Sequence, residues 1–230
     1  MSDTEYTGTI DWDDYWETAD EGVREDTSPS GDLVLEPFVE FLETRVDGPE
    51  SYADVGCGPG DLAVEVTERY PGATVVGYDA APAVLAENRE RAREAGLDVD
   101  FERAVLPEFD PGRQFEVVSC LFTLCYVADI ERAVERLYDA VAPGGYLVLE
   151  YHNRLAQAHF ARTAAAPHEY LDEDAAWNPE TFAERFELVV EGESLLSYDR
   201  IHEVLGRWPQ SVFSVADGAD RYEPLVFVPK

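Results

Sequence analysis

The stretch Ala53-Asp54-Val55-Gly56-Cys57-Gly58-Pro59-Gly60 decides the fold that we expect for this chain. It begins in a short apolar run, residues 52–55, and a helical pattern follows it at residues 61–70. Closely spaced glycines between a strand and a helix permit a sharp bend and bring bare backbone amides close to a ligand. The stretch therefore predicts a strand, a glycine turn and a helix that together bind a small molecule.

Strands and helices alternate on both sides of the glycine turn. Apolar or β-branched residues recur at residues 74–78, 99–102, 115–120 and 146–151, where we predict further strands, the last one after a turn at Pro143-Gly144-Gly145. Helical spacing of apolar residues covers residues 33–42, 83–95 and 130–141. Five strands joined by helices predict a parallel sheet, because each crossover is a right-handed β-α-β unit.

The pattern changes after residue 151. It predicts a helix at residues 179–186, strands at 188–196 and 225–228, and a helix within residues 198–220. With these strands the fold class is α/β: a doubly wound, mostly parallel seven-stranded sheet with an antiparallel C-terminal strand. A length of 230 residues fits one such domain.

The charge of the chain is strongly negative. Its 49 acidic residues oppose 17 basic ones, for a formal net charge of −32, and Lys230 is the only lysine. This surplus disfavours a nucleic-acid partner, because it repels phosphate groups. We expect a halophilic, acidic protein whose self-repulsion is screened in molar salt, where the Debye length is about 3 Å.

Several other classes of protein are disfavoured. No run approaches the roughly 18 consecutive apolar residues that a membrane span requires, and the N-terminus is acidic, so we expect a cytoplasmic protein with no membrane partner. No pair of histidines has the spacing of a zinc site, and the three cysteines form no C-x-x-C motif, so we expect no metal. The oligomeric state cannot be read from the sequence.

The spacing of the glycines indicates which ligand the turn binds. A dinucleotide fingerprint G-x-G-x-x-G would place its third glycine where this chain has Asp61. A carboxylate is unfavourable beside a pyrophosphate. Asp54, by contrast, can meet the ammonium of an amino acid directly or through water, so the pattern favours S-adenosyl-L-methionine over a nicotinamide dinucleotide.

The same residues carry a resemblance to a known family. The run from Ala53 to Gly60, the acidic Asp79 after the second strand, and the turn Pro143-Gly144-Gly145 are similar to the motifs of the Rossmann-like (class I) S-adenosyl-L-methionine-dependent methyltransferases. The resemblance covers residues 33–151 well and the remainder only in its number of strands. It implies the Rossmann-like methyltransferase fold and S-adenosyl-L-methionine as the cofactor.

The resemblance also implies a role for individual residues. The glycine turn would hold the methionine end, Asp79 the ribose hydroxyls, and an aromatic residue of the N-terminal segment would close over the cofactor. The residues after the third strand would flank the adenine, but this chain has no acidic residue there to meet the adenine amine. The implied cofactor contacts are Asp54, Gly56, Cys57, Gly58, Gly60, Asp79, Ala80, Ala104, Val105, Cys120, Leu121, Tyr15 and Trp16.

The predicted organisation separates two functions. Residues 1–32 form an aromatic segment or lid, and residues 33–230 form the methyltransferase domain, with a cofactor half at 33–151 and an acceptor-side half at 152–230. The acceptor is unidentified, and we expect a small molecule. If it must lose a proton, the candidate bases are His152, Tyr126 and Tyr151.

Two other functions stay open at this point. A nicotinamide-dependent oxidoreductase would use the same sheet but is disfavoured by Asp61. A non-catalytic protein that binds S-adenosyl-methionine would carry the same glycine turn and transfer no methyl group. Titration with both cofactors and an assay of methyl transfer distinguish the three.

Overall fold

The strands form one seven-stranded sheet. The computed structural model describes residues 10–18, 34–171, 177–215 and 224–230. The strand order is β3-β2-β1-β4-β5-β7-β6; strands β1 to β5 are parallel, and β7 is antiparallel to both of its neighbours. The predicted fold class is therefore confirmed. The strands are β1 (Ser51–Val55), β2 (Thr74–Asp79), β3 (Val99–Arg103), β4 (Phe115–Cys120), β5 (Val141–Glu150), β6 (Gln210–Ser211) and β7 (Leu225–Pro229).

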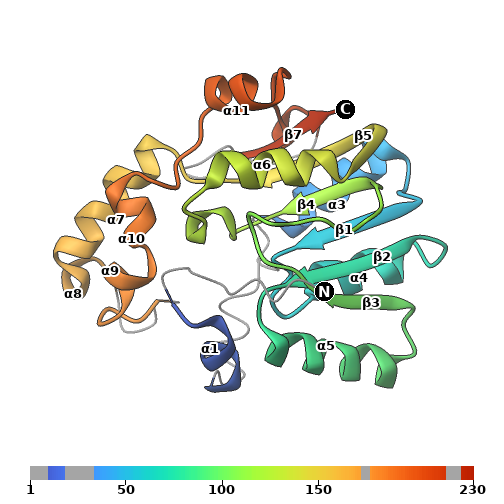
Figure 1. Cartoon of the computed structure of the whole chain (residues 1–230), viewed down its shortest axis with the longest axis horizontal. Helices are drawn as coiled ribbons and strands as arrows, with labels where there is room; N and C mark the ends of the chain where they lie inside the picture. The colour runs from blue at the N-terminus through green and yellow to red at the C-terminus, as the bar shows by residue number, and fades with distance from the viewer. Residues whose placement is uncertain (1–9, 19–33, 172–176, 216–223) are drawn as a thin grey trace.

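Helices cover both faces of the sheet. One face packs against α3 (Leu35–Phe41), α4 (Asp61–Arg69) and α5 (Pro82–Ala95), and the other packs against α6 (Ile130–Asp139) and α11 (Tyr198–Leu205). The remaining helices lie beyond the carboxyl ends of the parallel strands (Figure 1). They are α1 (Trp12–Thr18), α7 (Arg154–Ala165), α8 (Pro167–Tyr170), α9 (Phe182–Arg185) and α10 (Glu187–Glu191).

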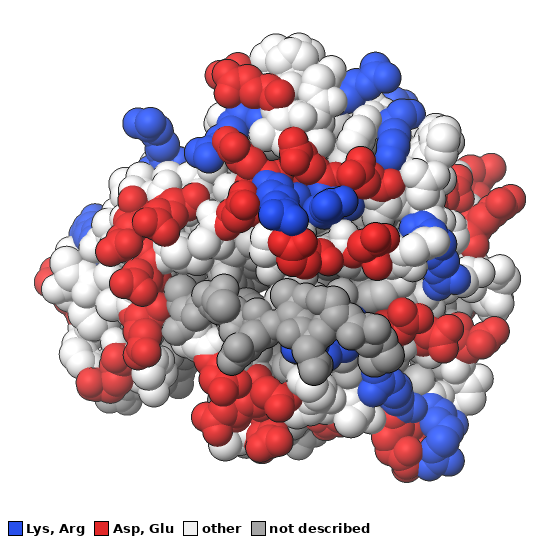
Figure 2. Space-filling model, viewed as in Figure 1, with Lys and Arg blue, Asp and Glu red and all other residues white. Residues whose placement is uncertain are grey.

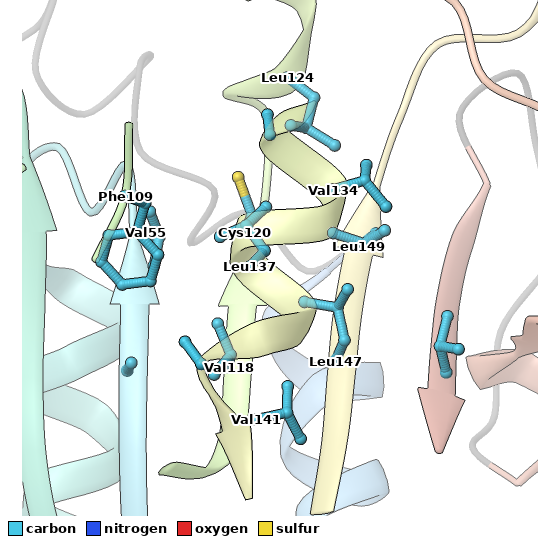
Figure 3. Close-up of a cluster of buried hydrophobic side chains, with 14 of the residues drawn as sticks. Val55, Phe109, Val118, Cys120, Leu124, Val134, Leu137, Val141, Leu147 and Leu149 are labelled. Atoms are coloured by element: carbon cyan, nitrogen blue, oxygen red, sulfur yellow. The ribbon is translucent and has the colours of Figure 1, made fainter. Parts of the chain in front are cut away.

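The core between the sheet and α6 is built from alternate strand residues. Val55, Val118, Leu147 and Leu149 point to this face; Val118, Leu147 and Leu149 lie near Leu137 of α6, and Val55 lies beside Phe109 (Figure 3). Their burial removes apolar surface from water, which stabilises a fold by about 1.5–3 kcal/mol for each fully buried side chain. Neighbouring residues of a strand point to opposite faces, so Asp54, which precedes Val55, points to the face that α3, α4 and α5 cover.

Two predicted elements near the C-terminus are wrong. Residues 188–196 were expected to be a strand, but the chain forms α10, which ends at Gly192 with a φ of +82°, and then a turn. Val189 packs into a third apolar cluster with Phe160 and Phe186. This cluster lies among the helices and contains no residue of the sheet. The seventh strand is instead the two-residue β6, which pairs with β7. Of the helix expected at residues 179–186, only α9 is helical.

The turn expected at Pro143-Gly144-Gly145 is also corrected. Strand β5 already begins at Val141, which pairs with Phe115, and the register shifts before Tyr146 pairs with Val117. The turn is therefore an irregularity inside β5, not a connection before it. The helix expected at residues 33–42 is shorter at its start and continues beyond α3 as a π-helical turn at Leu42–Val46.

Within the described residues, no helix combines the length and the apolar character that crossing a membrane requires. No three His, Cys, Asp or Glu side chains in these ranges are grouped so that they could hold a metal ion.

Candidate active site

The glycine turn joins β1 to α4 at the carboxyl edge of the sheet. Gly56, Gly58 and Gly60 have φ angles of +79°, +48° and +79°, a region that glycine adopts without steric penalty. A Cβ atom at Gly56 would lie 2.1 Å from Thr123 Oγ1. The Gly56 N–H donates to Tyr78 O over 2.7 Å. The turn is thus fixed between β2 and the loop after β4, and its glycines let the Thr123 and Trp16 side chains lie directly on the backbone.

Asp79 ends β2 and connects the turn to the start of α5. Its Oδ2 accepts from the Gly58 N–H over 2.9 Å, and its Oδ1 accepts from the Ala81 N–H over 3.0 Å. Burial raises the pKa of Asp79, and the N–H groups of Ala81, Gly58 and Ala80 oppose the shift. An ionised carboxylate has about four lone-pair sites, so these bonds leave acceptor capacity for the hydroxyl groups of a ligand.

Asp54 belongs to a buried network under the turn. It lies opposite Ser119 of β4, whose hydroxyl donates to Asp54 Oδ1 over 3.1 Å and lies 2.6 Å from the Tyr52 hydroxyl. Burial raises the pKa of Asp54 to about 7; the Ser119 bond opposes this shift, and the charge of Asp79 adds to it. A cation placed here would favour the ionised form. Sequence reasoning missed Ser119, although a serine inside the apolar strand 115–120 was a signal.

The residues predicted beside the adenosine begin next to Asp79. The Ala104 N–H donates to Asp79 O over 2.9 Å, and the following Val105 is buried. Sequence reasoning missed Asn88, which lies on the buried face of α5 and donates from Nδ2 to Gly58 O over 2.8 Å. The signal was an amide on an apolar helix face, where a polar side chain needs a partner.

The loop after β4 crosses the glycine turn. The predicted residues Cys120 and Leu121 are buried, and Phe122 has a φ of +52°, a left-handed conformation that costs a residue with a side chain about 1–2 kcal/mol. The buried Glu150 holds it, because Glu150 Oε2 accepts from the Phe122 N–H over 2.9 Å. The Thr123 hydroxyl donates to Leu121 O over 3.0 Å. Sequence reasoning missed the part of Glu150 and Thr123 in this loop.

Helix α1 brings aromatic rings to the turn. Asp13 Oδ1 accepts from the N–H of Ala83, in the first turn of α5, over 2.9 Å. Trp16 is buried, and a Cβ atom at Gly58 would lie 3.4 Å from its ring. Tyr15 packs edge-on against Trp16, with 5.2 Å between the ring centroids. The other residues of the predicted lid, 1–9 and 19–32, lie outside the described residues.

The three candidate bases lie in different surroundings. Tyr151 is in the apolar cluster on the α6 face of the sheet. His152 packs edge-on against Phe160, and its Nδ1 lies 3.7 Å from Glu150 Oε1. Burial lowers the pKa of His152 to about 4, so this imidazole is neutral at neutral pH. Burial also raises the pKa of Tyr126 well above its usual value, so this phenol keeps its proton.

Comparison with known proteins points to the same part of the chain. Residues 53–147 match the family model described as a methyltransferase domain. Over 102 residues the chain is 43% identical to demethylmenaquinone methyltransferase of Thermus thermophilus, and this match covers 44% of this chain and 46% of that protein. Over 134 residues it is 36% identical to trans-aconitate 2-methyltransferase of Variovorax paradoxus, and this match covers 56% of this chain and 50% of that protein. The chain thus spans about half the length of the curated relatives it matches.

The likeness to solved structures extends further along the chain. Magnesium protoporphyrin IX methyltransferase from Synechocystis PCC 6803 with bound SAH superposes with a TM-score of 0.55 at 16% identity, over 85% of this chain and 81% of that one. At this identity the likeness shows the fold. The three proteins are named for different methyl acceptors, so the likeness does not single out an acceptor for this chain.

Proposed function

We propose that this chain is an S-adenosyl-L-methionine-dependent methyltransferase that acts on a small-molecule acceptor. The observation that carries the proposal is the convergence of Asp54 and Asp79 on one glycine turn at the carboxyl edge of a parallel sheet. Ligands of open α/β sheets bind at this edge. The match of residues 53–147 to a methyltransferase domain, and the solved methyltransferase structures with the same fold, support the proposal.

The side chains at the turn fit the cofactor. Its amino-acid end carries an ammonium group that Asp54 can meet, and the ring of Trp16, which lies against Gly58, would cover that end of the cofactor. Asp79 has acceptor capacity for the ribose hydroxyls. Ala104 is hydrogen-bonded to the Asp79 backbone, and together with Val105 it would lie beside the adenine. When bound, the cofactor supplies a methyl group activated by a sulfonium. The chain's own task is to align the acceptor with that methyl group and to exclude water.

The nicotinamide alternative is disfavoured by the contacts of Asp61. This residue occupies the third-glycine position of a dinucleotide fingerprint, and its carboxylate pairs with Arg91 Nη2 over 3.1 Å at the start of α4. A pyrophosphate at that helix start would meet the carboxylate. The non-catalytic alternative shares every cofactor contact, so the transfer of a methyl group must decide it.

If the acceptor must lose a proton, we propose His152 as the base. Burial lowers its pKa to about 4, so the imidazole is unprotonated at neutral pH but a weak base, and it lies beside Glu150, which holds the loop after β4. Tyr126 is a neutral phenol and suits hydrogen-bond donation. Tyr151 is a weaker candidate, because it lies on the α6 face of the sheet. We assign the cofactor to residues 33–151, the acceptor to residues 152–230, and the role of an aromatic lid over the cofactor to the N-terminal segment that contains α1.

We also propose that the protein is adapted to high salt. The net charge is −32, and Figure 2 shows groups of acidic side chains spread over the visible face, with fewer basic side chains between them. Their repulsion destabilises a compact chain in dilute buffer and is screened in molar salt. The same charge disfavours a nucleic-acid acceptor.

Calorimetry in molar KCl tests the cofactor assignment. S-adenosyl-L-homocysteine (SAH) should bind with one site per chain, and NADH should not. A screen of small molecules with methyl-labelled S-adenosyl-L-methionine then tests the activity. Binding of NADH without binding of SAH would overturn the proposal, whereas binding of SAH with no transfer to any acceptor would favour the non-catalytic alternative.

A further inference from the structure

An arginine lies inside a group of aromatic rings next to the proposed active site. Arg185 ends α9, and its guanidinium carbon lies 5.3 to 5.8 Å from four ring centroids. The four rings, which we call the aromatic cage, are those of Trp12, Tyr15, Tyr126 and Phe186. They come from α1, from the turn after β4 and from the acceptor-side half, so the fold brings together three separate parts of the chain.

The cage holds a permanent positive charge. Arg185 Nε donates to the Tyr126 hydroxyl over 3.0 Å. Burial raises the pKa of Tyr126 well above its usual value, so the phenol does not neutralise the guanidinium. Burial alone would lower the pKa of Arg185, but Tyr126 and Tyr15 outweigh it and raise that pKa. An arginine is in any case charged at every physiological pH.

The surroundings of Arg185 differ from those of the surface arginines. Arg132 pairs with Glu108 over 2.8 Å and Arg200 with Glu131 over 2.7 Å, with side chains that are 40% exposed or more. Such pairs are typical of a solvated acidic surface. Arg185 is half-buried and hydrogen-bonds to tyrosine side chains, among rings that exclude water and so strengthen electrostatic contacts made there.

The cage lies on the way from the glycine turn to the acceptor-side half. Trp16 covers Gly58, its neighbour Tyr15 packs against it, and Tyr15 also contacts the guanidinium of Arg185. On the other side, Tyr126 belongs to the 3-10 turn Leu124–Tyr126, which follows the loop that crosses Gly56. An acceptor held against the glycine turn by α1 therefore lies within the field of this cation.

These contacts indicate the chemistry of the acceptor. Aromatic cages in proteins often bind ligand cations, but here the protein's own guanidinium takes that position. A second cation would be repelled, and a guanidinium fork matches the two oxygens of a carboxylate. We infer that Arg185 and the aromatic cage form an anion-binding subsite that selects acceptors carrying a carboxylate next to a flat, unsaturated group. This inference rests on the proposed methyl transfer to a small acceptor.

Paired probes test the subsite. Benzoate and benzamide have the same ring and differ in charge, so their dissociation constants, measured by calorimetry with and without saturating SAH, report the preference for an anion. The wild-type protein should bind benzoate more tightly by on the order of 10- to 100-fold, as expected for a charged hydrogen-bonded pair. Arg185→Gln should remove this preference, and Arg185→Lys, which keeps the charge without the fork, should retain part of it.

Two further variants keep the test informative. Arg200→Gln removes the same charge from an exposed pair and should leave the preference unchanged. Tyr126→Phe removes the hydroxyl that accepts from Nε but keeps the ring, so it should weaken the preference several-fold even if Arg185→Gln loosens the cage.

The outcomes separate this inference from the proposed function. Equal binding of benzoate and benzamide by the wild-type protein overturns the subsite, as does an unchanged preference in Arg185→Gln. Choline that binds in competition with benzoate also overturns it, because it would show that the cage opens for a cation. Failure of SAH to bind would instead refute the proposed cofactor, while the comparison without SAH would still decide the subsite.

Discussion

Replacing Asp54 with asparagine should stabilise the ligand-free protein at neutral pH and weaken its binding of SAH. The pKa of Asp54 is raised from 3.8 to about 7, chiefly by burial. One pKa unit corresponds to about 1.36 kcal/mol, so ionised Asp54 lowers the free energy of unfolding by on the order of 4 kcal/mol. The amide introduced by Asp54→Asn would keep an acceptor for Ser119, but its new N–H donors, if left without partners, would offset about 1–3 kcal/mol of the gain.

The sign of the pH dependence follows from proton binding. Between pH 3.8 and about 7 the folded state binds the Asp54 proton more tightly than the unfolded state does. The contribution of Asp54 to the free energy of unfolding of the wild-type protein is therefore greatest at low pH. This contribution is lost as the pH rises through the folded pKa. Asp54→Asn has no such proton, so its advantage over the wild type should grow with pH and level off above about pH 7.

Urea unfolding at constant molar KCl measures this difference. The gap in unfolding free energy between Asp54→Asn and wild type should widen by about 1.4 kcal/mol per pH unit between pH 5 and 6, and more slowly as the pH approaches 7. Asp98→Asn removes the same charge at an exposed position and should show no comparable trend. SAH should bind the Asp54→Asn variant more weakly at pH 8, with a smaller deficit at pH 5. A gap that does not change with pH would refute the assignment of a raised pKa to Asp54.

Three further predictions concern the turn, the ribose contact and the salt. Gly56→Ala should abolish SAH binding in calorimetry, because its Cβ would lie 2.1 Å from Thr123 Oγ1, whereas Gly96→Ala, with a φ of +68° and open space around it, should bind normally; equal binding would contradict this. Asp79→Ala should weaken SAH binding by on the order of 1–3 kcal/mol, and wild-type affinity in the same titration would mean that Asp79 does not contact the ligand. The melting temperature should climb from dilute to molar KCl in scanning calorimetry, and a flat dependence would rule out the halophilic adaptation.

The centre of the parallel sheet was predictable because β1, β2 and β4 are buried along most of their length. Such strands are largely apolar, and the helices between them carry helical spacing, so these strands follow from pattern alone. The glycine turn was equally plain, because its positive φ angles require glycine whatever the tertiary structure. Asp54 and Asp79 could be singled out because a carboxylate at the end of an apolar strand is costly to bury unless it binds a partner or a ligand.

The misses share a physical origin in contacts between distant parts of the chain. The apolar run at residues 188–190 suits a strand or a helix, and only its packing against α7 and α9 made it helical. Strand β6 has two residues, too few for a pattern. Glu150 looked like the end of a strand, and its bond to Phe122 depends on a backbone conformation that a sequence does not show. Arg185 was one arginine among sixteen until the fold placed four rings around it.

We predict that helix α1 couples the binding of the proposed cofactor to that of the proposed acceptor. Through Asp13 and Trp16 it contacts α5 and the glycine turn, and through Trp12 and Tyr15 it contacts the guanidinium of Arg185. A ligand that orders this helix from one side reduces the entropy that a ligand on the other side must lose. Because such coupling is reciprocal, a carboxylate probe should bind more tightly with SAH present by the same factor by which the probe tightens SAH. The chain would then favour the complex in which both reactants are present and α1 excludes water from them.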